Sequence, residues 1–134
     1  TYNVTSPPER FSMGALVSAS VSAAVAFAKP EVDPAPMWMP ADFLASQGVQ
    51  AWSDMPVWLP AEGSQLAFAA TRVDRALQAG LNVRALQSTV DDTLTWHLGR
   101  PDTERASLKT GLARDKEARV LAAWHARTDE PATS

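Results

Sequence analysis

The chain has 134 residues, of which 46% are hydrophobic and 20% charged, a balance typical of a globular domain with a real core. Its net charge is -3 at pH 7, and its 15 acidic and 12 basic residues are interspersed, so the sequence indicates no nucleic-acid partner. The absence of cysteine excludes thiol catalysis, thiolate zinc sites and disulfides. It is compatible with a cytoplasmic location, which we expect.

The first predicted element is a short strand at Tyr2-Asn3-Val4, a β-prone run that ends before Pro7 and Pro8. A lone strand leaves backbone groups unpaired on both sides, so we expect a neighbouring element, encoded upstream, to complete it.

A helix is predicted over residues 13–28, with Ser12 as its N-cap, Val17 and Val21 on its apolar stripe, and Pro30 preventing continuation. This stretch is too polar and too short to span a bilayer, which needs about 20 apolar residues. We therefore expect no membrane partner.

The middle of the chain is rich in proline. Residues 37–39 lie between prolines and predict a second strand or an extended segment. Pro40 opens a short helix through Ala45, and Gly48 lies near its end. Residues 52–60, with prolines at 56 and 60, predict a turn or loop.

Helices dominate the second half. Thr71 is a predicted N-cap for a helix that stops at Gly80, and Ser88 with Asp91 resembles a capping box that opens the next helix. A short segment is predicted over residues 103–110 and a last helix over residues 114–126. The pattern predicts a helix-rich α+β domain over residues 1–127, with two or three short strands and no Rossmann sheet, and a flexible tail over residues 128–134.

Four groups of residues occur in the order of a known family's motifs: Tyr2-Asn3-Val4-Thr5 with Met13-Gly14-Ala15-Leu16; Arg75-Ala76 with Ala79-Gly80-Leu81; Arg84-Ala85-Leu86, Thr89-Val90, Asp92-Thr93-Leu94 and Trp96; and Gly111-Leu112 with Leu121-Ala122-Ala123-Trp124-His125. From Tyr2 to His125 the chain resembles the C-terminal substrate-binding region of the extended short-chain dehydrogenase/reductases, of the NAD-dependent epimerase/dehydratase kind. Ala85 stands where the family more often has proline.

The resemblance implies a full-length protein that transfers hydride with NAD or NADP and uses a tyrosine acidified by a lysine four positions later. Here the only tyrosine is Tyr2, and Ser6 stands four positions later. The six glycines, at 14, 48, 63, 80, 99 and 111, never form the Gly-x-Gly-x-x-Gly turn that cradles a dinucleotide. We therefore expect no catalytic and no cofactor-binding residue in this chain, and a missing N-terminal Rossmann domain as its partner.

The resemblance also implies that this region shapes the substrate pocket. Aromatic and soft apolar side chains in irregular segments are the candidates for its wall: Trp38, Trp52, Met55, Trp58 and Phe68. Each has a core role as its alternative. Arg75 and Arg84 are candidates for contact with an anionic substrate, with solvated helix surface as their alternative. We expect no metal site, because His97 and His125 both fit structural roles.

Two functions remain open. In the first, the chain is the substrate-specificity part of a longer NAD(P)-dependent oxidoreductase or epimerase and is not catalytic in isolation. In the second, it is a stand-alone module that binds a small molecule or a partner after losing the nucleotide-binding domain. Assembly into a homo-oligomer through the terminal helices is a further alternative.

Overall fold

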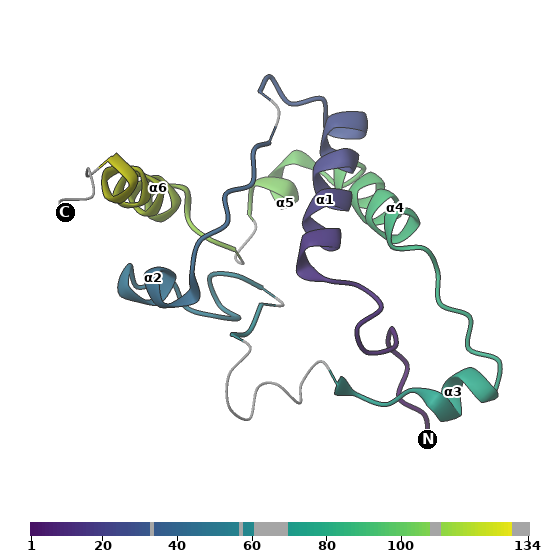
Figure 1. The fold of residues 1–134 in the computed structure, drawn as a ribbon. Helices are drawn as coiled ribbons and strands as arrows, with labels where there is room; N and C mark the ends of the chain where they lie inside the picture. The colour runs from purple at the N-terminus through teal and green to yellow at the C-terminus, as the bar shows by residue number, and fades with distance from the viewer. Residues whose placement is uncertain (33, 57, 61–69, 108–110, 130–134) are drawn as a thin grey trace. The chain divides into compact units, whose positions relative to one another are not determined.

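The computed structural model describes residues 1–32, 34–56, 58–60, 70–107 and 111–129 (Figure 1). Helical residues make up 53% of the part that it describes. The elements in chain order are α1 (Met13–Ala23), the π-helical turn η1 (Ala24–Ala28), α2 (Ala41–Ser46), α3 (Asp74–Gln78), α4 (Leu86–Leu98), α5 (Asp102–Ala106) and α6 (Arg114–Asp129).

The prediction of two or three short strands is wrong, and with it the α+β class: within the described ranges the chain forms no strand, only an isolated bridge between Ala51 and Met55. Residues 2–4 and 37–39 are coil. A β-prone run becomes a strand only when a partner accepts its backbone hydrogen bonds. Asn3 instead uses its side chain, whose Nδ2 donates to the carbonyl oxygen of Arg72 at 3.2 Å.

The chain divides into two compact units. Unit 1 comprises Thr1–Met37 and Ala61–Ser107, and unit 2 comprises Trp38–Pro60 and Leu108–Ser134. The prediction of one domain over residues 1–127 stays a prediction. None of the described helices combines the length and the apolar character needed to cross a bilayer.

Unit 1 is built on the packing of α1 against α4, which lie side by side (Figure 1). The most buried positions of α1 are Ala19 and Ala23, at 7% and 1% exposure, rather than the predicted stripe through Val17 and Val21. Small side chains let two helices approach closely. The approach is fixed by Gln87 of α4, whose Nε2 donates to the carbonyl oxygen of Ala19 at 3.2 Å.

The ends of α1 follow the sequence prediction. The hydroxyl of Ser12 accepts a hydrogen bond from the backbone N–H of Ala15 at 3.1 Å, which confirms the predicted N-cap. The last turn is π-helical, and Lys29 ends it in the left-handed conformation at φ 46° with its N–H donating to Ala24.

The ends of α3 and α4 follow the sequence prediction only in part. Val73, not Thr71, precedes α3, and no side chain caps that helix. The predicted stop is confirmed, because Gly80 has φ 97° and the N–H of Leu81 donates to the carbonyl of Ala76 at 2.9 Å. The capping box is wrong, since α4 begins two residues before Ser88.

Unit 2 holds a small core of α2, the residues after it and α6. Phe43, Val49 and Val120 are buried there. The ring of Phe43 meets the ring of Trp124 edge-on, with 4.9 Å between centroids. The last predicted helix is confirmed and extends to Asp129, while residues 130–134 of the predicted tail lie outside the described residues.

Candidate functional site

The aromatic loop, residues 50–56 and 58 of unit 2, is a tight turn closed by its own backbone. The N–H of Trp52 donates to the carbonyl of Trp58 at 3.1 Å, and the N–H of Asp54 donates to the carbonyl of Gln50 at 3.0 Å. Trp52 has φ 68°, a left-handed conformation that is uncommon for a bulky residue, and its side chain is 54% exposed. Such a conformation persists only where surrounding bonds hold it.

Lys116 of α6 fastens this loop. Its Nζ lies 2.5 Å from Oδ2 of Asp54 and 2.6 Å from the carbonyl oxygen of Gly48. The same carboxylate oxygen accepts a hydrogen bond from the N–H of Gln50 at 2.7 Å. The ammonium of Lys116 and the Gln50 N–H lower the pKa of Asp54 below 3.8. The lysine and the aspartate are thus engaged in holding the loop on α6.

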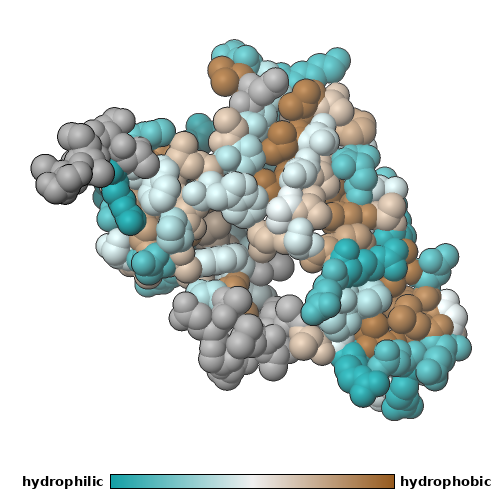
Figure 2. Space-filling view, in the orientation of Figure 1, coloured by the Kyte–Doolittle hydropathy of each residue, from teal (hydrophilic) through white to brown (hydrophobic). Residues whose placement is uncertain are grey.

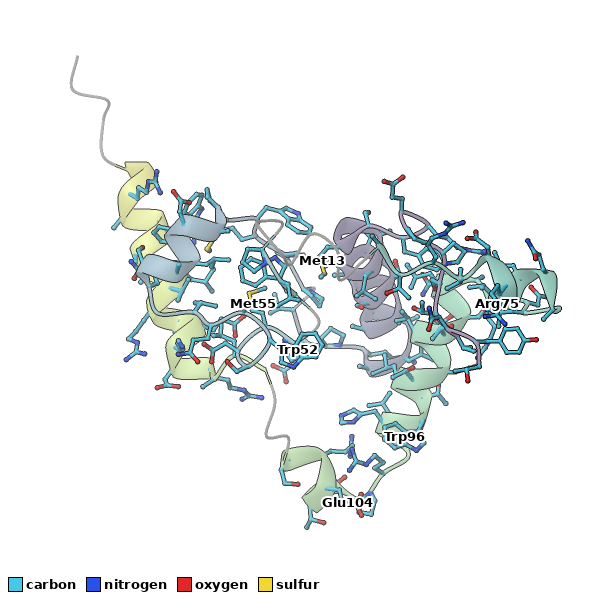
Figure 3. All side chains as sticks on the ribbon, turned by 90° about the horizontal axis from the view of Figure 1, so that it is seen from below. Met13, Trp52, Met55, Arg75, Trp96 and Glu104 are labelled. Carbon is cyan, nitrogen blue, oxygen red and sulfur yellow. The ribbon has the colours of Figure 1, made fainter. Side chains whose placement is uncertain are left out.

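The candidate wall residues differ in exposure. Trp38 is 63% exposed and Trp52 54%, while Trp58 is half-buried. Met55 packs against the core of Phe43, Val49 and Val120 (Figure 3). The structure therefore brings Trp52, Met55 and Trp58 into one loop. Phe68 lies outside the described residues.

A second feature, the Arg75 hollow, lies in unit 1. It is a cavity of about 570 Å³ between residues 1–3 and the region of α3, and its lining includes Tyr2, Asn3, Arg72, Asp74, Arg75 and Gln78. The guanidinium carbon of Arg75 lies 5.7 Å from the centre of the Tyr2 ring. Arg72 forms an ion pair with Asp74 at 2.8 Å.

The two candidate arginines are not brought to one site. Arg84 does not line the hollow, because its guanidinium pairs with Asp92 and donates to the carbonyl of Ser88 at 3.5 Å. Arg84 therefore contacts the first turns of α4. The sequence analysis missed Tyr2, Asn3 and Gln78, because no local pattern joins residues 1–3 to a helix some seventy positions later.

The glycines at 14, 48, 80 and 99 serve the ends of helices or lie within them. Gly48 and Gly80 follow α2 and α3 at φ 72° and 97°, and their left-handed backbone ends those helices. Gly14 lies inside the first turn of α1. Among the described residues no three histidine, aspartate or glutamate side chains gather in a way that would hold a metal ion.

Comparison with other proteins adds no relative. No family model, curated protein or solved structure matches the chain. The aromatic loop and the Arg75 hollow are therefore interpreted from their own chemistry. The aromatic loop offers flat apolar surface, and the hollow offers a cation beside an aromatic ring.

Proposed function

We propose that this chain is the substrate-specificity domain of an NAD(P)-dependent oxidoreductase or epimerase and that it is not catalytic in isolation. The ordered motifs from Tyr2 to Trp96 support the family, and one structural observation supports the role. Two tryptophans in irregular segments of unit 2, Trp38 and Trp52, remain more than half exposed. Burial of such side chains against a ligand gains roughly 25 cal/mol per Å² of apolar surface.

In this proposal the chain binds and orients a small molecule and performs no bond chemistry. A bound NAD or NADP would accept or donate hydride, and its site would lie on the N-terminal Rossmann domain, because the glycines of this chain are never spaced as Gly-x-Gly-x-x-Gly. Trp52 presents its ring to the substrate, and Asp54 with Lys116 holds the loop that carries it. A cytoplasmic location belongs to the same proposal.

The runner-up is a stand-alone small-molecule-binding or interaction module. The same exposed tryptophans favour it, since they need a ligand but no reaction. The two proposals predict different coding sequences ahead of Thr1. A Rossmann domain encoded there supports the first, and a gene that starts at Thr1 supports the second.

Two experiments test the first proposal. In calorimetric titrations of the 134-residue chain with NADH and NADPH we expect no heat of binding, and measurable binding of either nucleotide would contradict the proposal. In the full-length protein, Trp52→Ala should raise KM and leave kcat nearly unchanged. The matched control is Trp96→Ala, which removes a tryptophan of α4 that is 63% exposed, against 54% for Trp52, and that stacks with Arg100. Equal effects of both variants on KM would count against the proposal that the aromatic loop contacts the substrate.

A further inference from the structure

The Arg75 hollow has the size and the surfaces of a ligand site. Its volume of about 570 Å³ falls within the range of roughly 300–1,000 Å³ that small-molecule pockets occupy. Val73 and Ala76, which belong to its lining, are buried at 3% and 5% exposure and anchor the polar lining residues beside them. Tyr2 is 54% exposed, so a large part of this residue stays accessible to a ligand.

The side chains of the hollow carry a positive balance in an acidic protein. Arg72 and Arg75 contribute two positive charges and Asp74 one negative charge, which leaves one positive charge in a chain whose net charge is -3. The Asp74 carboxylate is already paired with Arg72 at 2.8 Å. Arg75 therefore carries the uncompensated charge.

Arg75 keeps its hydrogen-bond donors available. Among the described residues its guanidinium makes no ion pair and no hydrogen bond, and its one such contact is the face of the Tyr2 ring. A guanidinium has five N–H donors in a planar fork that matches the two oxygens of a carboxylate or phosphate. The exposed amide of Gln78 adds further donors to the same lining.

We propose that the Arg75 hollow binds a small organic anion with a flat ring, held by the Arg75 guanidinium through its carboxylate or phosphate group. The ring of the anion lies against the ring of Tyr2. Figure 2 shows hydrophilic surface beside hydrophobic surface over the region of α3. The inference goes beyond the proposed function, because the hollow in unit 1 is a separate site from the aromatic loop in unit 2.

The test is a titration of the ¹⁵N-labelled chain at low salt with benzoate and phenyl phosphate, followed by NMR. We expect saturable shifts of the Arg75 Nε–Hε signal and of the amides of residues 73–78 for at least one anion at concentrations up to roughly 10 mM. Benzamide has the same ring and no charge, and we expect its binding to be about tenfold weaker or more. The two anions distinguish a carboxylate from a phosphate ester.

Variants of Arg75 test whether its guanidinium holds the anion. Arg75→Gln should weaken anion binding about tenfold or more, and Arg75→Lys should restore part of it. The matched control is Arg10→Gln, which removes a cation that also stacks on an aromatic ring in unit 1, with 5.4 Å to the centre of Phe11. A dispersed NMR spectrum of each variant shows that the chain still folds.

Three results would overturn the inference: no saturable shift with either anion, equal binding of benzamide, or equal weakening by Arg10→Gln. The outcome is separable from that of the proposed function. Nicotinamide binding by the chain would remove the proposed function and leave the anion site, whereas a hollow that binds no anion leaves the role of Trp52 untouched.

Discussion

Replacing Phe43 by alanine tests whether the small core of unit 2 holds that unit together. Phe43 is 8% exposed and packs on Trp124 with 4.9 Å between ring centroids. A buried Phe→Ala substitution costs about 3–5 kcal/mol, and the aromatic pair accounts for about 0.5–1.5 kcal/mol beyond its area. Partly exposed neighbours such as Met55 can relax toward the space left behind, so we expect about 3 kcal/mol, at the lower end.

The assay is denaturant unfolding by circular dichroism, together with hydrogen exchange of the amides of α2 and α6. Phe43→Ala should lower the free energy of opening of both helices. Phe27→Ala is the control, because that ring is 49% exposed in unit 1, and we expect a loss below about 1 kcal/mol. A cost of Phe43→Ala below about 1 kcal/mol, or exchange that accelerates equally in α1, would refute the reasoning.

Three further predictions concern single contacts. Because the pKa of Asp54 is lowered below 3.8 in the folded chain, the stabilisation by the Asp54 carboxylate is complete above that pH and is lost as the pH falls below it. The difference in urea midpoint between wild type and Lys116→Met should therefore shrink on acidification. A constant difference would contradict this. Ser12→Ala should cost about 1 kcal/mol in thermal unfolding and accelerate exchange in the first turn of α1. Gly80→Ala should cost about 1–2 kcal/mol of folding free energy from its φ of 97° alone. The control Gly14→Ala, inside α1, should be neutral or stabilising. Equal costs of the two variants would argue against a left-handed residue as the end of α3.

Helix positions were predictable where the signal lies within one turn of the chain. Ser12 caps the backbone three residues ahead, and Gly80 ends α3 through a backbone conformation that glycine adopts without strain. The start of α4 was misplaced because Asp91 has a stronger local partner: its Oδ1 accepts from Nε2 of Gln87 at 2.7 Å and does not turn back to cap. Short polar side chains have several such options, so a capping pattern alone does not fix a boundary.

The candidate site was predictable by residue type and not by location. Aromatic side chains between prolines indicated the aromatic loop, but nothing in the sequence places Lys116 on Asp54, since these residues are 62 positions apart. The Arg75 hollow depends likewise on contacts between residues 1–3 and α3, of which the Asn3 bond to Arg72 spans 69 positions. Contacts of this kind follow from the packing of whole elements and leave no periodic pattern.

The failure of the strand predictions and the exposure of Tyr2 have one physical basis. A strand is stabilised by cross-strand pairs, each worth about 0.2–1 kcal/mol, so its propensity has no effect until a second strand lies alongside. Without such a pair, residues 2–4 use side chains for their long-range contacts: Asn3 bonds to the Arg72 carbonyl and the Tyr2 ring lies under Arg75. The same contacts that replace the strand also form one wall of the Arg75 hollow.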